Sequence, residues 1–193
     1  MIEEHLLSLT IWIPIVGALL VTLAPKSATR AIAAVASLLA MMASILVTLK
    51  FKPNGGFQME EHYSWIKSFN IEYFLAVDGI SVTMVLLTGI LSFICILASW
   101  GFDHWHTNKG IKGYFALFLL LEAGMMGVFE ALDFFLFYVF WEMMLLPMYF
   151  LIGIWGGPRR EYAAIKFFLY TLAGSVLMLV VMLAMYFSYD AHP

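Results

Sequence analysis

Two glutamates within uncharged stretches are the residues of this sequence best suited to carry out chemistry. Glu122 and Glu142 lie in apolar segments on either side of Leu132, each ten residues away from it. A chain that folds back at Leu132 as two helices brings both carboxyls to the same depth. Two carboxyls at one apolar depth cannot easily both ionise, because desolvation and mutual repulsion oppose it, so the pair can hold and pass a proton. The spacing therefore predicts a proton relay.

Glu142 is the stronger candidate of the two. Tyr138 and Tyr149 fall on roughly the same helix face as Glu142, and their hydroxyls can hydrogen-bond a buried carboxyl. Pro147 follows soon after and leaves one backbone carbonyl of the helix without its partner. The alternative for both glutamates is structural, with a protonated or hydrogen-bonded carboxyl that only joins helices. Glu130 is expected near the outer end of its helix, where water can reach it.

The composition places these carboxyls in a membrane. Of the 193 residues, 63% are hydrophobic and 12% are charged, whereas ordinary soluble domains have roughly 45–50% and roughly 25%. A chain of this length cannot form an interior large enough to bury so much apolar surface, so lipid must be the solvent. Soluble enzymes, nucleic-acid binders and disordered tails are excluded, because each needs polar or basic surface that is missing here.

The uncharged stretches predict an all-α fold, a polytopic membrane bundle of six transmembrane helices. A helix needs about 20 apolar residues to cross about 30 Å of hydrocarbon. Two of the helices are joined by a very tight turn, at which Asp133 suits the N-cap of the fifth helix. The predicted spans are residues 6–24, 31–49, 80–100, 114–132, 134–155 and 167–189.

The one long extramembrane segment is predicted at residues 51–76, on the outer side. Its Pro-Asn-Gly-Gly start breaks helical structure, and the aromatic residues that follow favour a short hairpin or a surface helix. Glu60, Glu61 and His62 have the residue types of a metal site. Solvated side chains on a polar loop are the favoured interpretation, because no fourth ligand is evident.

The distribution of basic residues predicts that both chain ends face outside. With this orientation seven of the ten Lys and Arg residues lie on the inner connections, as the positive-inside rule requires. The seven are Lys26, Arg30, Lys109, Lys112, Arg159, Arg160 and Lys166. The N-terminus begins MIEEH and lacks the basic region of a signal peptide, so the first apolar run is expected to be a mature transmembrane helix.

Small residues at four-residue intervals predict where the helices touch, because they let backbones approach closely. In the sixth predicted helix, Thr171 and Ser175 can also offer hydroxyls to a neighbour. The small residues are Ala36, Ala40 and Ser44 in the second helix and Ala123, Gly127 and Ala131 in the fourth.

Four segments resemble the antiporter-like membrane subunit family of respiratory complex I, known as chain M or subunit 4. They are residues 75–100, residues 127–142, residues 137–157 (FYVFWEMMLLPMYFLIGIWGG) and residues 159–175 (RREYAAIKFFLYTLAGS). In that family a glutamate of the fifth helix is implicated in proton transfer, and Glu142 holds the matching position within Trp-Glu-Met-Met. The resemblance gives no such role to Glu122, which stays a candidate on its spacing alone.

The resemblance implies a membrane subunit of NADH:quinone oxidoreductase that takes part in proton translocation coupled to quinone reduction. The expected location is the bacterial cytoplasmic membrane, and the expected partners are other membrane subunits, including related antiporter-like ones, and lipid, with no nucleic acid. Members of the family have about fourteen helices, and their glutamate pairs with a lysine on a broken seventh helix. Six helices therefore predict the N-terminal portion of a longer subunit. Lys166 lies at the inner end of the last span, so no lysine is expected at membrane depth.

No cofactor or metal is expected in this chain. The lone Cys95 cannot supply the four cysteine ligands of an iron–sulfur cluster, and the sequence has no Gly-rich nucleotide loop. NADH, flavin, iron–sulfur clusters and quinone are therefore expected in partner subunits. Two other functions remain open: a subunit of a multi-chain cation/proton antiporter or membrane-bound hydrogenase, and a purely structural bundle that supports assembly.

Overall fold

The computed structural model describes residues 5–53, 55–101 and 110–190. Helices account for most of this part of the chain, and a β-hairpin follows the second helix. The elements are α1 (Leu6–Leu23), α2 (Thr29–Lys50), β1 (Gln58–Ile66), β2 (Ile71–Val77), α3 (Ser81–Ala98), α5 (Ile111–Glu130), α6 (Phe134–Trp155) and α7 (Arg160–Asp190), with 3₁₀ turns at Lys67–Phe69 and Ser99–Gly101.

Six helices in the described residues are long and apolar enough to cross a membrane, which confirms the predicted number. The last of these helices, α7, already begins at Arg160, before the membrane span predicted to start at residue 167. The predicted start excluded every charged residue, including Lys166. A helix end at a membrane interface can carry such residues, because their long side chains direct the charge toward water.

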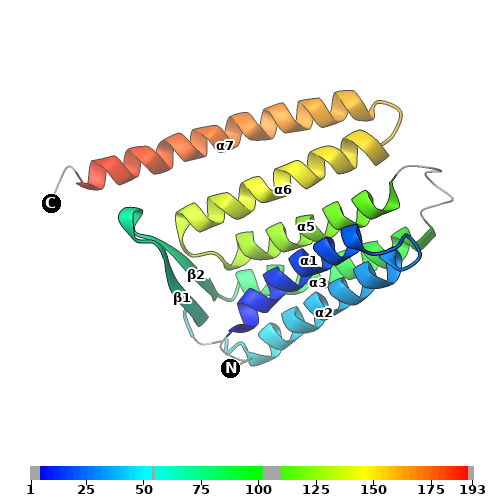
Figure 1. The fold of residues 1–193 in the computed structure, drawn as a ribbon. Helices are drawn as coiled ribbons and strands as arrows, with labels where there is room; N and C mark the ends of the chain where they lie inside the picture. Colours follow the sequence, from blue (N-terminus) through cyan, green and yellow to red (C-terminus); the bar gives the residue numbers. More distant parts are fainter. Residues whose placement is uncertain (1–4, 54, 102–109, 191–193) are drawn as a thin grey trace.

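The helices form a bundle in which chain neighbours lie side by side (Figure 1). α1 packs against α2 and α5, α2 packs against α3, and α6 lies between α5 and α7. α7 is at the edge of the bundle. α1 begins and α7 ends at the end that carries β1 and β2, here named the hairpin end. The opposite end, where α1, α3 and α6 end and α2, α5 and α7 begin, is named the loop end.

Three of the predicted small residues, Ala36, Ser44 and Gly127, lie at helix contacts. Ala131 does not, because α5 ends at Glu130 and Ala131 forms a β-bridge with Leu75 of β2. Ala36 of α2 faces Gly17 of α1, and a side chain on Gly17 would clash with it. Ser44 of α2 faces Gly89 of α3 in the same way, and Gly127 of α5 faces the ring of Phe140 in α6. These close approaches set the rotation of each helix about its axis, and hence the direction of its polar side chains.

The fold is not purely α-helical, because β1 and β2 form a two-stranded antiparallel sheet. Of the two alternatives predicted for residues 51–76, the hairpin is therefore confirmed. Its turn contains Asn70, whose φ of 53° is in the left-handed region that asparagine tolerates better than most residues. β2 contacts the α5–α6 turn through a hydrogen bond of 2.9 Å from Leu132 N to Phe74 O.

Asp133 is the N-cap of α6, as predicted. Its Oδ1 accepts a hydrogen bond of 2.9 Å from Leu136 N in the first turn of the helix. Its Oδ2 accepts a bond of 3.3 Å from Glu72 N of β2. One carboxylate therefore fixes the start of α6 and holds the hairpin against it.

Candidate proton-transfer site

Glu122 and Glu142 lie at the same depth in the bundle. Glu122 is eight residues before the end of α5 at Glu130, and Glu142 is eight residues after the start of α6 at Phe134. At 1.5 Å per residue, the Cα of each glutamate lies about 12 Å from the hairpin end of its helix. The prediction that the turn between α5 and α6 brings the two glutamates to one level is confirmed.

The two glutamates nevertheless do not form a pair, and this part of the prediction is wrong. A side chain on Gly124 of α5 would lie 2.6 Å from Met144 Cγ, so these two residues mark the faces that α5 and α6 turn toward each other. Glu122 precedes Gly124 by two residues and Glu142 precedes Met144 by two, and two residues correspond to about 200° around a helix. Both carboxyls therefore point away from the α5–α6 contact, in opposite directions.

Glu122 faces α2. Its side chain is fully buried, and its Oε1 accepts a hydrogen bond of 3.0 Å from the Ser37 hydroxyl. Its Oε2 is buried without a hydrogen-bond partner among the described residues. Ser37 is not among the residues predicted for the site, although its place among the small residues of α2, four residues after Ala33, is a signal that could have identified it.

Glu142 faces α7. The Tyr138 side chain makes hydrogen-bond interactions with Glu142, one turn along α6, and with Ser175 of α7. Ser175 is 3% exposed, and Tyr149 on the same face of α6 packs against Phe168 of α7 with ring centroids 5.2 Å apart. Tyr138 is therefore at this carboxyl, as predicted, whereas the Tyr149 ring packs against α7. The Ser175 hydroxyl lies beside Tyr138 and donates a hydrogen bond of 3.1 Å to Leu172 O.

The Glu142 carboxyl can accept further hydrogen bonds. Its Oε1 is buried and has no hydrogen-bond partner among the described residues, while the side chain as a whole is only partly buried. A carboxyl with one tyrosine partner and one unoccupied oxygen can bind a proton and can accept a further donor, such as water. Pro147 lies within the unbroken α6 and frees one backbone carbonyl of the helix, which adds an acceptor nearby.

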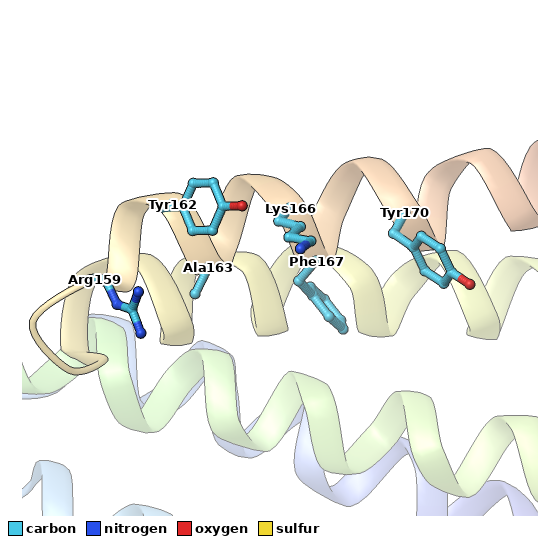
Figure 2. Close-up of a pocket in the computed structure, with 6 residues that line it drawn as sticks. All are labelled: Arg159, Tyr162, Ala163, Lys166, Phe167 and Tyr170. Atoms are coloured by element: carbon cyan, nitrogen blue, oxygen red, sulfur yellow. The ribbon is translucent and has the colours of Figure 1, made fainter.

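A basic, aromatic groove lies at the loop end of α7, well away from Glu142. Figure 2 shows its lining residues on one side of the helix: Arg159, Tyr162, Ala163, Lys166, Phe167 and Tyr170. The Lys166 ammonium lies 5.8 Å from the centre of the Tyr162 ring, a cation–π contact. Nine residues, or about 14 Å of helix, separate Lys166 from Ser175. Lys166 is therefore not at the depth of Glu142, in agreement with the sequence analysis.

Two other acids differ from their predicted surroundings. Glu130 is fully buried and not water-accessible, because the hairpin packs over the end of α5. Glu61 is 3% exposed and binds the start of α1, where the prediction had a solvated loop residue. Within the described residues, no group of three or more His, Cys, Asp and Glu is placed to hold a metal ion.

The chain is similar in sequence to known membrane proteins. Residues 131–190, which contain α6 and α7, match the family described as NADH:quinone oxidoreductase/Mrp antiporter, TM. The chain is 42% identical over 191 residues to NADH-quinone oxidoreductase subunit M of Rhodobacter capsulatus, an alignment that covers 95% of this chain. The chain is therefore similar to subunit M over almost its whole length. It spans 36% of the length of that relative.

Solved structures contain the same arrangement of helices. The chain superposes on a chain of respiratory complex I from Thermus thermophilus with a TM-score of 0.78 and 26% identity, covering 92% of this chain and 35% of that one. It also superposes on a chain of the Mrp complex from Dietzia sp. DQ12-45-1b with a TM-score of 0.74 and 20% identity, covering 90% of this chain and 18% of that one. The second likeness concerns the fold alone.

Proposed function

We propose that this antiporter-like chain is part of a membrane subunit of an NADH:quinone oxidoreductase and takes part in proton translocation coupled to quinone reduction. The surroundings of the Glu142 carboxyl are the observation on which the proposal rests. A carboxyl at membrane depth, inside the segment that matches the family, has Tyr138 as its partner and one oxygen still unoccupied, and Tyr138 in turn interacts with Ser175 of α7. An ionisable group at this depth is costly, so its presence favours a function.

Glu142 is the principal proton-transfer residue in this proposal. Its carboxyl binds the proton, and the Tyr138 hydroxyl, which interacts with Ser175 as well, offers a hydrogen-bonded route toward α7. A carboxyl alone holds a proton without driving it onward. The change in local charge that would release the proton must come from outside the described helices, because Lys166 lies at the loop end. This part of the subunit is therefore not expected to pump on its own.

Glu122 is proposed as a separate proton-binding group and not as the partner of Glu142. Its bond to Ser37 and its free Oε2 give it the same chemical capacity, on the opposite side of the α5–α6 pair. Any proton exchange between the two glutamates would have to pass around the contact between Gly124 and Met144. Their contributions to proton transfer should therefore be independent.

The partners in this proposal are other membrane subunits of the same complex, including related antiporter-like subunits, and lipid. NADH, flavin, iron–sulfur clusters and quinone belong to partner subunits, and the complex lies in the bacterial cytoplasmic membrane. The single cysteine, Cys95, supports this division, because it cannot provide the ligand set of a cluster.

A cation/proton antiporter is the second candidate, favoured by the description of the family that matches residues 131–190, which names the Mrp antiporter beside NADH:quinone oxidoreductase. Membrane vesicles from cells with and without the intact gene separate the two functions. A complex I subunit predicts that loss of the gene abolishes NADH-driven proton uptake and leaves sodium-driven proton exchange unchanged. The opposite pattern, with NADH-driven uptake intact and sodium-driven exchange lost, would assign the chain to an antiporter.

The orientation of the chain is tested by labelling single cysteines from each side of the membrane. The basic residues predict that Gly56, before the hairpin, faces outside and that Gly157, in the α6–α7 connection, faces inside. Both residues are exposed, and a side chain at either position meets no atom within 4 Å. In a Cys95→Ser background, Gly56→Cys should react with an impermeant reagent added outside and Gly157→Cys only with reagent inside. Reaction of Gly157→Cys from outside would contradict the orientation.

A further inference from the structure

A second cluster of buried polar groups lies at the hairpin end of the bundle, about 12 Å of helix away from the level of Glu142. Glu130, the last residue of α5, is fully buried, and the proposed function makes no use of it. Glu61 of β1 is 3% exposed. The two carboxyls are close enough to act on each other electrostatically, and both act on the Tyr73 hydroxyl of β2. Their hydrogen bonds differ in a way that decides where a proton lies.

Glu61 has the surroundings of an ionised carboxylate. Its Oε1 accepts hydrogen bonds from Leu7 N at 2.8 Å and Ser8 N at 3.0 Å, in the first turn of α1. Its Oε2 accepts a bond from the Ser8 hydroxyl, which lies 3.0 Å from the Tyr73 hydroxyl. N–H groups at the start of a helix stabilise a negative charge. The negative charge of this cluster therefore lies on Glu61.

Glu130 has the opposite surroundings. Thr10 Oγ1 lies 2.7 Å from Glu130 Oε1 and also 2.7 Å from the backbone carbonyl oxygen of Leu7. A hydroxyl has one hydrogen to donate, and both of these neighbours are acceptors when Glu130 is ionised. Both contacts are hydrogen bonds only when Glu130 is protonated and donates to Thr10, while Thr10 donates to Leu7.

Burial favours the same protonation state. Glu130 Oε2 is buried without a hydrogen-bond partner among the described residues. A neutral acid tolerates such an oxygen far better than a carboxylate does, because an unsolvated charge costs much more than an unsolvated carbonyl group. Thr10, its partner, is fully buried as well.

The backbone of β1 explains why Glu61 points into this cluster. Glu61 is the buried residue of a strand whose other residues are partly or fully exposed. The register shifts between Gln58 and Glu61, and Met59 between them has a φ of 56°, which is unusual for a residue with a side chain. A bulge of this kind redirects the side chain that follows it. An irregular strand therefore supplies the charged neighbour of Glu130.

We propose that Glu130 and Thr10 form a second proton-binding site, in which Glu130 carries the proton and donates it in a hydrogen bond to Thr10. The ligand is a single proton. The charge on Glu61 keeps the proton bound to Glu130, because two ionised carboxylates in this cluster would repel each other. Of the two, Glu61 has N–H donors that offset a negative charge. The titratable groups that face Glu130 from the packed elements are Glu61 and Tyr73, with His5 lying 3.9 Å beyond Glu61.

Infrared spectroscopy of the assembled complex tests the site, because a neutral carboxylic acid has a C=O stretching band that a carboxylate lacks. Glu130→Gln should remove one such band at neutral pH, since glutamine keeps the shape without the acid. Thr10→Val should shift this band and Thr10→Ser should leave it in place, because only serine retains the hydroxyl. Glu72→Gln, on the part-exposed surface of the hairpin, is the matched control and should leave the band unchanged.

Equal neutral-acid intensity in the wild-type and Glu130→Gln spectra would show that Glu130 is ionised and would overturn the proposal. A band that keeps its frequency in Thr10→Val would place the proton away from Thr10, with the same consequence. If Glu130→Gln does not assemble, the comparison of Thr10→Val with Thr10→Ser still decides the question. The Glu130 band should persist in Glu142→Gln, so this test is independent of the proposed function.

Discussion

A complex that carries Glu142→Gln is expected to assemble normally and to lose most of its NADH-driven quinone reduction, by about tenfold or more, which corresponds to at least about 1.4 kcal/mol in the activation barrier. Glutamine is nearly isosteric and neutral, so it can keep the contact with Tyr138. It cannot bind and release a proton, so the coupled reaction should slow with proton transfer. The measurements are the amount of intact complex on a native gel and the rate of quinone reduction by NADH in membranes.

Three further variants separate a proton-transfer role from a packing role. Glu142→Asp is shorter by one methylene but still ionisable, so it should be milder than Glu142→Gln. Tyr138→Phe removes the hydroxyl between Glu142 and Ser175 and should give an intermediate loss. Glu161→Gln, at an exposed position in the first turn of α7, is the charge-matched control and should stay within about twofold of wild type. A Glu142→Asp variant as slow as Glu142→Gln would indicate that shape, and not ionisation, is required.

Gly127→Leu is expected to prevent the complex from accumulating. A side chain on Gly127 would meet three carbons of the Phe140 ring, all closer than side chains can approach. Overpacking of this kind costs about 1–3 kcal/mol, or more where a rigid ring cannot move. The α5–α6 contact sets the direction of both Glu122 and Glu142, so the loss should appear in assembly before it appears in catalysis.

Gly174→Leu is the matched control for Gly127→Leu. Gly174 also lies within a membrane-spanning helix, α7, but a side chain there meets no atom within 4 Å. The amount of assembled complex and its melting temperature in detergent should be near wild type for Gly174→Leu and clearly lower for Gly127→Leu. Equal stability of the two variants would mean that the α5–α6 contact is looser than the structure indicates.

The depth of the buried carboxyls could be predicted from the sequence, but their direction could not. Depth follows from the lengths of two apolar stretches and from the turn at Asp133, all of which are local features. Direction depends on the rotation of α5 about its axis, which the contact of Gly124 with Met144 determines. Gly127 is a contact residue predicted from the sequence, and its helical phase relative to Glu122 is the signal that could have given this direction. That phase places Glu122 on the face away from α6.

The buried cluster at the hairpin end, with Glu130, Glu61 and Thr10, could be predicted least from the sequence. Glu130 lies at a helix end, where water is normally available, and only the long-range packing of β1 and β2 buries it. Glu61 lies after a bulge, so the alternation of a regular strand gives no guide to its direction. Thr10, the partner of Glu130, has no distinguishing neighbour in the sequence. Contacts between residues more than a hundred positions apart, such as that of Thr10 with Glu130, require the folded structure.

The most direct test of the central claim is proton uptake driven by NADH in vesicles that contain the assembled complex, compared between wild type and Glu142→Gln. If Glu142 is the principal proton-transfer residue, the variant should assemble, and its rates of NADH oxidation and of proton uptake should fall together by about tenfold or more. If Glu142→Gln takes up protons at the wild-type rate and with the wild-type ratio of protons to NADH, Glu142 is a packing residue and the proposed role is wrong.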